Sequence, residues 1–202
     1  NWGIIGCGDV TEVKSGPAFK KVPGSRLIAV MRRDAAKAAD YAKRHGIPEW
    51  YDNADSLIGD PDVNAIYIAT PPDAHEQYAS AAIKAGKPVY VEKPMALNEA
   101  AARNMAAMAA AAGVKLTVAH YRRQWPMFKQ LKQLVEQQVI GEPRLVRLEF
   151  YKQAPSSTEL SDPKNAWRVN PAISGGGLFH DLAPHQLDIL YYLFGDAVSI
   201  SG

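Results

Sequence analysis

The fold is decided by the stretch Trp2-Gly3-Ile4-Ile5-Gly6-Cys7-Gly8, in which a short apolar run leads directly into two closely spaced glycines. An apolar run of this kind predicts a buried strand that ends in a tight turn. In a parallel α/β sheet, such a turn binds a pyrophosphate at the N-terminus of the next helix. The sequence therefore predicts a dinucleotide site at Gly6 and Gly8, continued by Asp9 and Val10.

The glycine motif is incomplete, because the third glycine of the dinucleotide fingerprint would fall at position 11, where this chain has Thr11. An ordinary strand-to-helix turn is therefore the open alternative. Gly16-Pro17 also interrupts the helix expected after the turn. The place of the motif, in the first turn after the first strand, favours the dinucleotide site.

Apolar runs continue to alternate with amphipathic stretches over the first 120 residues. Strands are predicted at 27–31, 65–69, 89–91 and 115–119, and helices at 34–45, 74–85 and 98–112. Asp34 and Asn98 are predicted N-caps, and Gly46 and Gly113 stand where their helices end. We therefore expect an α/β fold, with a doubly wound parallel sheet (a Rossmann domain) over residues 1–120.

The pattern changes in residues 121–202. A helix is predicted over 126–138, and residues 144–151 alternate in the period of two that is typical of a half-buried antiparallel strand. An apolar helix then reaches Phe194, and residues 198–200 begin another predicted strand. We expect the beginning of an α+β domain with an open, mainly antiparallel sheet. Because these elements do not close a domain, we also expect the chain to be a fragment.

Composition excludes several classes of protein. Lys and Arg number 23 against 21 acidic residues, and the net charge of +2 comes without a basic run, so nucleic acid is not an expected partner. Cys7 is the single cysteine, which excludes a disulfide scaffold. No apolar run approaches the ~18 residues of a membrane span, so no membrane partner is expected. His45 and Glu49 are too isolated to predict a metal site, and the default location is the cytoplasm.

The end of the strand at 27–31 bears on the choice of cofactor. A carboxylate at this point binds the adenosine ribose, whereas an arginine accommodates a 2′-phosphate. Here Arg32 and Arg33 follow the strand directly, which favours NADP(H) over NAD(H). In the alternative interpretation both arginines are solvated and Asp34 only caps a helix.

Two later stretches have the form of a known signature pair. The first is Thr70-Pro71-Pro72-Asp73-Ala74-His75 followed by Lys87-Pro88-Val89-Tyr90-Val91-Glu92-Lys93-Pro94. The second is Trp167-Arg168 followed by Ser174-Gly175-Gly176-Gly177-Leu178-Phe179-His180-Asp181 and by His185 and Asp188. Together they closely resemble the Gfo/Idh/MocA oxidoreductases, which include glucose–fructose oxidoreductase and inositol dehydrogenase. The resemblance covers essentially the whole chain.

The resemblance implies hydride transfer between nicotinamide C4 and a carbinol or carbonyl carbon of a carbohydrate-like substrate: a sugar, a polyol or a related cyclic alcohol. It also implies a homo-oligomer, either a dimer or a tetramer. Two other functions stay open, namely a dinucleotide-sensing regulatory protein without turnover and a glycosidase that uses NAD transiently.

Three residues match the catalytic trio of that family, Lys93, Asp181 and His185. Lys93 follows a predicted buried strand, where a lysine can donate a hydrogen bond to a substrate oxygen and stabilise charge on it. Asp181 and His185 are four residues apart, so on a helix they share a face, and histidine exchanges protons near neutral pH. In the alternative interpretation Lys93 pairs with Glu92, Asp181 caps the helix and His185 is a buried polar residue. Pro184 fits the helix if it begins near Asp181.

The same resemblance assigns the remaining contacts. Cofactor contacts are implied for Thr70, Pro71, His75, Glu92, Lys93, Trp167 and Arg168. Substrate contacts are implied for Tyr121, Arg122, Asp181 and His185. A Pro-Pro turn with a helix start explains Thr70 to His75 equally well, and solvated charge is the alternative for Tyr121 and Arg122.

Overall fold

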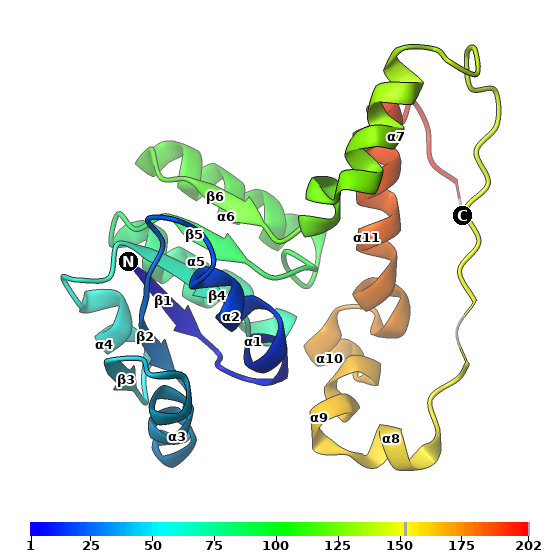
Figure 1. Ribbon diagram of the computed structural model, residues 1–202. Coiled ribbons are helices and arrows are strands. Elements are labelled where there is room, and N and C mark those ends of the chain that lie inside the picture. The colour runs from blue at the N-terminus through cyan, green and yellow to red at the C-terminus, as the bar shows by residue number, and fades with distance from the viewer. Residues whose placement is uncertain (152, 202) are drawn as a thin grey trace. The chain divides into compact units, whose positions relative to one another are not determined.

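The computed structural model describes residues 1–151 and 153–201. Its contacts divide the chain into two compact units (Figure 1). Unit 1 consists of Asn1–Ala119 together with Ala172–Gly175, and unit 2 consists of His120–Pro171 together with Gly176–Gly202. No helix among the described residues is long and apolar enough to cross a membrane.

Unit 1 is built on a six-stranded sheet in which all neighbouring strands are parallel. The strands are β1 (Trp2–Ile5), β2 (Leu27–Met31), β3 (Glu49–Tyr51), β4 (Ala65–Ile68), β5 (Val89–Val91) and β6 (Leu116–Val118). Their order in space is β3-β2-β1-β4-β5-β6. Successive strands are thus added on one side of β1 up to β3 and on its other side from β4 onwards, so the strand order reverses between β1 and β4. This is the dinucleotide-binding strand order, in which ligands bind outside the carboxyl ends of the strands at the reversal.

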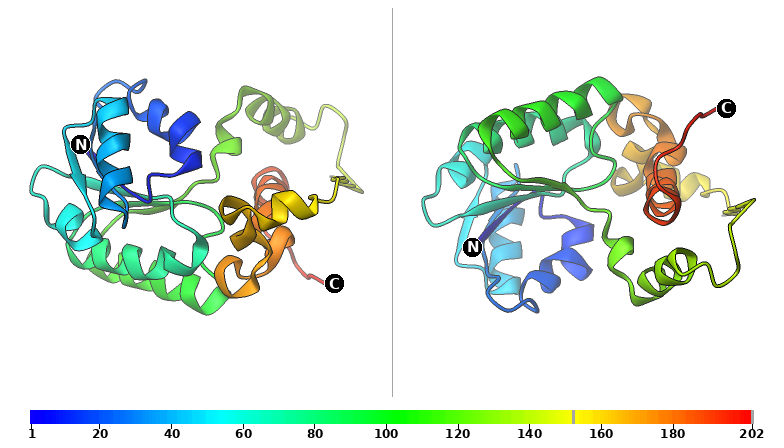
Figure 2. Two further views of the ribbon diagram at one scale, coloured as in Figure 1. Left: turned by 90° about the horizontal axis from the view of Figure 1, so that it is seen from below. Right: turned by 90° about the horizontal axis from the view of Figure 1, so that it is seen from above.

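Helices cover both faces of the sheet, which confirms the predicted doubly wound fold (Figure 2). The helices of unit 1 are α1 (Asp9–Val13), α2 (Ser15–Phe19), α3 (Ala35–His45), α4 (Ala54–Gly59), α5 (His75–Lys84) and α6 (Glu99–Ala112), with a 3₁₀ turn η1 (Pro72–Ala74). On one face a buried cluster joins the strands to α4, α5 and α6 through side chains such as Leu57, Ile83 and Met105. On the other face Ile4, Tyr41 and Tyr67 belong to a second cluster that includes α3.

The predicted capping residues of two helices are confirmed. The Asp34 side chain accepts a hydrogen bond from the Lys37 N–H at 3.1 Å, and Gly46 ends α3 with φ +60°. Asn98 and Gly113 do the same for α6. The helix after the glycine turn is indeed interrupted, because it ends at Val13 and α2 begins at Ser15.

Every regular element among the described residues of unit 2 is a helix or a 3₁₀ turn, and the long stretch between Glu136 and Ser157 has no regular structure where it is described. Its elements are the 3₁₀ turn η2 (Tyr121–Gln124), α7 (Pro126–Glu136), α8 (Ser157–Ser161), α9 (Pro163–Ala166), the 3₁₀ turn η3 (Trp167–Val169) and α11 (Gly177–Phe194), and α10 (Pro171–Ser174) lies where the chain passes between the units. The helix expected over 126–138 is confirmed, with its end at Glu136.

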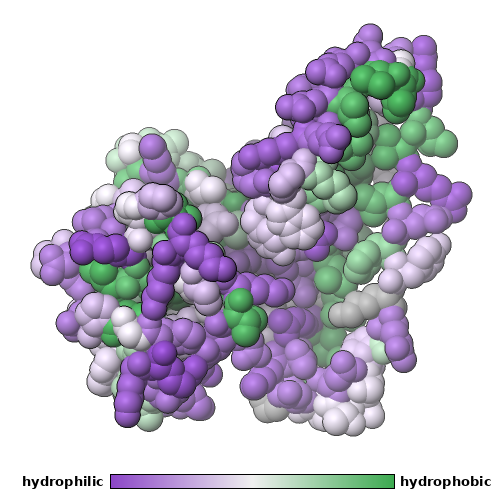
Figure 3. All heavy atoms as spheres, viewed as in Figure 1, coloured by the Kyte–Doolittle hydropathy of each residue, from purple (hydrophilic) through white to green (hydrophobic). Residues whose placement is uncertain are grey.

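Two strand predictions in unit 2 are wrong. Residues 144–151 and 198–200 form no strand, although both carry apolar side chains at alternate positions. A strand exists only through its ladder with a neighbour, and no described segment pairs with either stretch. Their apolar side chains accordingly stay exposed, among them Leu145, Phe150 and Val198. Figure 3 shows apolar residues gathered on the surface of unit 2.

The start expected for the last helix also needs correction. It begins at Gly177, four residues before Asp181, so Pro184 lies inside the helix instead of in its first turn. Proline lacks an N–H, so at this point α11 loses one bond of its ladder. Beyond the proline, α11 buries Ile189 and Leu193.

Candidate functional site

The glycine turn follows β1 and leads into α1. Gly6 has φ +92°, and a Cβ on it would lie 2.7 Å from Thr70 Cγ2 and 2.9 Å from the Thr70 backbone nitrogen. Only glycine fits such a position. Gly8 is the N-cap of α1, and a Cβ there would meet no atom nearer than 4.0 Å. The turn is thus closed on the side of Thr70 and open beside Gly8, where Asp9 and Val10 begin the helix.

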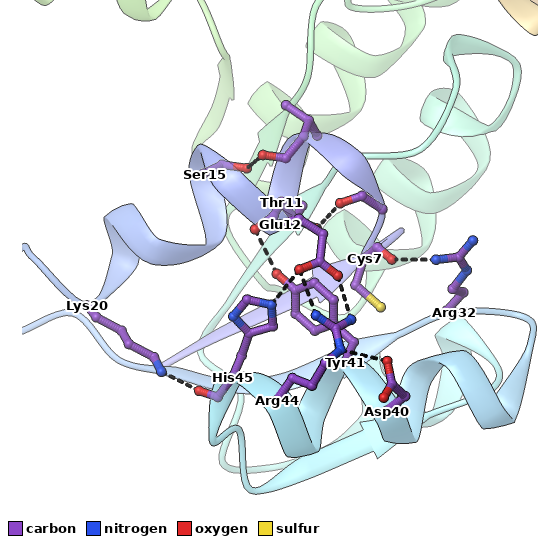
Figure 4. Close-up of polar contacts among 12 residues, drawn as sticks. Cys7, Thr11, Glu12, Ser15, Lys20, Arg32, Asp40, Tyr41, Arg44 and His45 are labelled. Carbon is purple, nitrogen blue, oxygen red and sulfur yellow. Dashed lines mark hydrogen bonds and ion pairs between the residues drawn. The ribbon is translucent and has the colours of Figure 1, made fainter. Parts of the chain in front are cut away.

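Arg32 reaches this turn from the end of β2. Its Nη1 donates a hydrogen bond to the Cys7 carbonyl oxygen at 3.1 Å (Figure 4). Arg33 is exposed, and Asp34 caps α3 while its carboxylate lies 3.0 Å from Lys37 Nζ. Burial raises the pKa of the Cys7 thiol to about 11, so this cysteine is a neutral filler at the turn.

An ionic cluster attaches α1 to α3 behind the turn (Figure 4). The Glu12 carboxylate accepts hydrogen bonds from Arg44 Nη2 at 2.6 Å and Arg44 Nη1 at 2.9 Å, and His45 Nε2 lies 2.7 Å from it. The hydrogen bonds from Arg44 are the main reason why the pKa of Glu12 falls to about 2. The Tyr41 hydroxyl adds a bond of 2.8 Å to the Thr11 carbonyl oxygen.

His75 joins the loops that follow β4 and β5. Its ring is fully buried, with Nε2 2.8 Å from the Thr70 carbonyl oxygen and Nδ1 2.9 Å from the Pro94 carbonyl oxygen. Burial lowers the pKa of His75. The ring therefore bridges the two loops, and its predicted cofactor contact stays a prediction.

Thr70 itself fits a ligand-binding role. Its Oγ1 is buried and has no hydrogen-bond partner among the described residues. A buried hydroxyl without a partner is costly unless a ligand or water satisfies it. The half-buried Pro71 follows as the N-cap of η1. Together with the open side of Gly8, Thr70 provides features that a bound dinucleotide requires.

Lys93 lies half-buried in the loop after β5, and a cis peptide bond joins it to Pro94. The preceding Glu92 is also half-buried. Glu92 Oε1 accepts a hydrogen bond from the Tyr67 hydroxyl at 2.5 Å, and Glu92 Oε2 accepts one from the Lys93 N–H at 3.3 Å. No sequence pattern indicates this contact of Tyr67, because the residue stands among the apolar positions of a predicted buried strand.

The other predicted catalytic residues lie in unit 2, on α11. His185 is buried, and its ring meets the ring of Tyr121 edge-on at 5.4 Å between centroids. Asp181 Oδ2 lies 3.5 Å from Arg168 Nε. Because α11 begins at Gly177, Asp181 lies inside the helix and is not its cap, which removes that alternative.

Neighbouring residues of unit 2 complete the description of the predicted site. The Arg168 guanidinium lies 4.6 Å from the ring centre of Trp167, and its Nη1 donates to Asn165 Oδ1 at 2.9 Å. Arg122 lies 5.8 Å from the ring centre of Trp125. Its Nε is buried without a hydrogen-bond partner in the described part of the chain. These contacts orient the two guanidinium groups but do not identify a ligand for either of them.

Sequence reasoning did not assign a role to the ion pair of Arg123 with Asp188. Asp188 Oδ1 accepts a hydrogen bond from Arg123 Nε at 2.7 Å and lies 2.5 Å from Arg123 Nη2 in the same ion pair. The Asp188 side chain is only 5% exposed, and its carboxylate raises the pKa of Arg123. This pair fastens η2, which carries Tyr121 and Arg122, to α11. The available signal was an acidic residue, Asp188, between the apolar Leu187 and Ile189.

A shallow cavity of about 360 Å³ lies on unit 2 beside the same helix. It is lined by His120, Phe179, His180, Ala183, Pro184, Leu187, Asp188 and Tyr191. Its surface is mainly apolar, with His120, His180 and Asp188 as the groups that can ionise.

Known proteins match this chain over almost its whole length. Residues 1–120 match the family described as "Oxidoreductase family, NAD-binding Rossmann fold", and residues 128–202 match the "GFO/IDH/MocA C-terminal domain". Oxidoreductase P35 of Formosa agariphila is 48% identical over 200 residues, which is 99% of this chain and 62% of that protein. The 1,5-anhydro-D-fructose reductase of Ensifer adhaerens is 31% identical over 204 residues, covering 99% of this chain and 59% of the reductase.

Solved structures agree with these matches. A levoglucosan dehydrogenase in complex with NADH and levoglucosan superposes with a TM-score of 0.79 at 28% identity, over 97% of this chain and 54% of that one. The chain therefore spans 54% to 62% of the length of these three proteins. The match to the N-terminal family model covers more than half of the chain and agrees with the sheet order and the glycine turn. The chain belongs to the Gfo/Idh/MocA family of NAD-binding oxidoreductases.

Proposed function

We propose that this protein transfers a hydride between a nicotinamide dinucleotide and a CH–OH carbon of a sugar, a polyol or a related cyclic alcohol. The observation that carries the proposal is the glycine turn, which is open beside Gly8 and adjoins the unsatisfied hydroxyl of Thr70. The substrate class is supported by relatives named for 1,5-anhydro-D-fructose and levoglucosan.

The cofactor, when bound, supplies the hydride chemistry, and this chain supplies binding and proton handling. Lys93 donates a hydrogen bond to the substrate oxygen and stabilises the negative charge that develops on it. In the oxidising direction His185 takes the hydroxyl proton, and Asp181 orients the substrate or the imidazole. Tyr121 and Arg122 add substrate contacts.

The proposal keeps the cofactor contacts that the sequence predicts. They are Gly6, Gly8, Asp9, Val10, Arg32, Arg33, Thr70, Pro71, His75, Glu92, Lys93, Trp167 and Arg168. Self-association as a dimer or a tetramer belongs to the same proposal, and light scattering after size exclusion measures it directly.

Turnover of Lys93→Ala tests the catalytic assignment. We expect kcat to fall at least ~100-fold, as for other groups that stabilise developing charge, while the Kd for dinucleotide stays within a few fold. Lys84→Ala, which removes an exposed lysine at the end of α5, is the matched control and leaves kcat unchanged. An unchanged kcat in Lys93→Ala would remove the assigned role.

Dinucleotide binding without turnover of any sugar or polyol would favour a sensor, and glycoside cleavage without net NAD(P)H change would favour a glycosidase.

A preference for NADP(H) is the finer proposal on the cofactor, and it rests on the approach of Arg32 to the glycine turn. Fluorescence titration with NADPH and NADH compares the protein with its Arg32→Ala, Arg33→Ala double variant. We expect NADPH affinity to fall by roughly ten- to a hundredfold and NADH affinity to change much less, because charge-assisted bonds to a phosphate are lost. Equal losses for both nucleotides would mean that these arginines do not read the 2′-phosphate.

A further inference from the structure

Tyr67 places a hydroxyl inside the sheet of unit 1, at a point where a strand normally carries only apolar side chains. It lies in β4, opposite Ile4 of β1 and Tyr90 of β5, and it is fully buried. Its ring stacks on Tyr90 at 5.3 Å between centroids and packs against Phe19 at 5.5 Å. These contacts hold the ring in one orientation and thereby fix the position of its hydroxyl group.

The hydroxyl connects two segments that are far apart in sequence. On one side it donates to Glu92 Oε1 at 2.5 Å, and Glu92 Oε2 accepts from the N–H of Lys93 at 3.3 Å. On the other side Ser15 Oγ lies 3.1 Å from the Tyr67 oxygen and 3.3 Å from the Val10 carbonyl oxygen, and its single proton serves one of these two oxygens. A line of polar contacts thus runs from α1, the helix after the glycine turn, to the backbone of Lys93.

The phenol acts as the donor to Glu92. Burial, together with the neighbouring Glu92 carboxylate, raises the pKa of Tyr67 far above its usual value, so the proton stays on the oxygen. A hydrogen bond from a neutral hydroxyl to a carboxylate is among the stronger ones available to a protein. The bond therefore holds the Glu92 carboxylate in one place.

We propose that Tyr67 is a positioning residue that fixes Glu92, and through it the backbone of Lys93, relative to the glycine turn. This inference rests on the proposed function, because the position of Lys93 affects turnover only if Lys93 takes part in it. Tyr67 touches neither substrate nor cofactor in this role. It acts through the carboxylate that it holds.

The test is the Tyr67→Phe variant, which removes one oxygen and keeps the ring packing. We expect kcat to fall roughly ten- to a hundredfold, the range that corresponds to losing a hydrogen bond to a charged group, while KM for the substrate changes less than about threefold. In a Glu92→Ala background the same removal should change kcat less than about twofold, because the acceptor is already gone. A purely structural role predicts equal effects in both backgrounds.

Tyr51→Phe is the matched control. Its hydroxyl also donates to a carboxylate, Asp60 Oδ2 at 3.0 Å, but at the edge strand β3. We expect kcat of this variant to equal that of the unaltered protein. A kcat of Tyr67→Phe within about twofold of the unaltered protein, or an equal loss in the presence and absence of the Glu92 carboxylate, would overturn the inference.

A second readout separates this inference from the proposed function. The rate of reductive methylation of Lys93, followed by mass spectrometry, reports the surroundings of its amine without any turnover. We expect Tyr67→Phe to change that rate and Tyr51→Phe to leave it unchanged. If the unaltered protein has no oxidoreductase activity, the proposed function fails, whereas an unchanged methylation rate in Tyr67→Phe refutes the positioning role itself.

Discussion

Replacing Glu12 with glutamine should weaken the attachment of α1 to α3 in a way that depends on pH. Glu12 receives both Nη atoms of Arg44, at 2.6 Å and 2.9 Å, and lies 2.7 Å from His45 Nε2. The substitution keeps the shape of the side chain but removes its charge. It therefore tests the ionic cluster and little else.

The size of the effect follows from the pKa of Glu12. A carboxylate whose pKa falls from 4.5 to about 2 on folding contributes at most about 3 kcal/mol at neutral pH. The Arg44 side chain is 46% exposed and that of Glu12 30%, so solvent screening reduces this value. We expect Glu12→Gln to lower the free energy of unfolding by about 1–2 kcal/mol near pH 7.

The sign with pH is set by the direction of the shift. The pKa of Glu12 is lower in the folded than in the unfolded state, so its contribution is complete above about pH 5 and is lost as the pH falls towards 2. Urea unfolding of both proteins, followed by circular dichroism between about pH 7 and about pH 3, measures the difference. That difference should shrink as the pH falls.

Glu99→Gln is the matched control for this measurement. Glu99 pairs with Arg103 four residues later on α6, but the two side chains are 76% and 78% exposed. We expect a cost below about 0.5 kcal/mol at every pH. A Glu12→Gln difference that is as small as this control, or that stays constant down to about pH 3, would refute the assignment of the stabilisation to the ionised carboxylate.

The remaining predictions concern the glycine turn and the ion pair of unit 2. Gly6→Ala should cost about 2–4 kcal/mol of stability, because its φ of +92° and the 2.7 Å approach to Thr70 exclude a Cβ. Gly8→Ala should change stability by less than about 1 kcal/mol but weaken dinucleotide binding at least ~tenfold, and similar melting temperatures for the two variants would contradict this contrast. Arg123→Met should cost about 2–4 kcal/mol by removing the guanidinium that pairs with the buried Asp188 carboxylate, and Asp188→Asn in that background should recover part of the loss.

Local chemistry accounts for the parts of the fold that the sequence predicts. Asp34 with Gly46, and Asn98 with Gly113, mark the ends of α3 and α6 because capping depends on neighbours in sequence. The short elements β3 and α4 were missed. Glu49 and Trp50 of β3 are exposed, so this edge strand has no apolar pattern, and α4 has only six residues.

Residues 144–151 illustrate the opposite error. Their alternation predicts a strand, but strand formation depends on a partner that a local pattern does not contain. The start of α11 was missed because Pro184 signals a helix start locally, whereas the helix begins at Gly177. The strand error shows that contacts distant in sequence decide what a local pattern leaves open.

The residues of the candidate site also fall into two groups, those that the sequence reveals and those that only the structure reveals. The residues of the two signatures are found in sequence because their types and spacing are distinctive. Tyr67, which is 25 residues from Glu92, and Arg123, which is 65 residues from Asp188, become apparent only through contacts in space. His75 belongs to a signature, and only the structure shows that its ring is buried between two backbone carbonyl oxygens.

The buried imidazole of His75 also restricts how this protein can vary. One ring spans the carbonyl oxygens of Thr70 and Pro94, at 2.8 Å and 2.9 Å, so an insertion or a deletion in either loop would pull one of them out of reach. The lengths of the two loops are therefore coupled, because the ring keeps the distance between them constant. Adaptation to a different substrate has to come from segments that this ring does not bind.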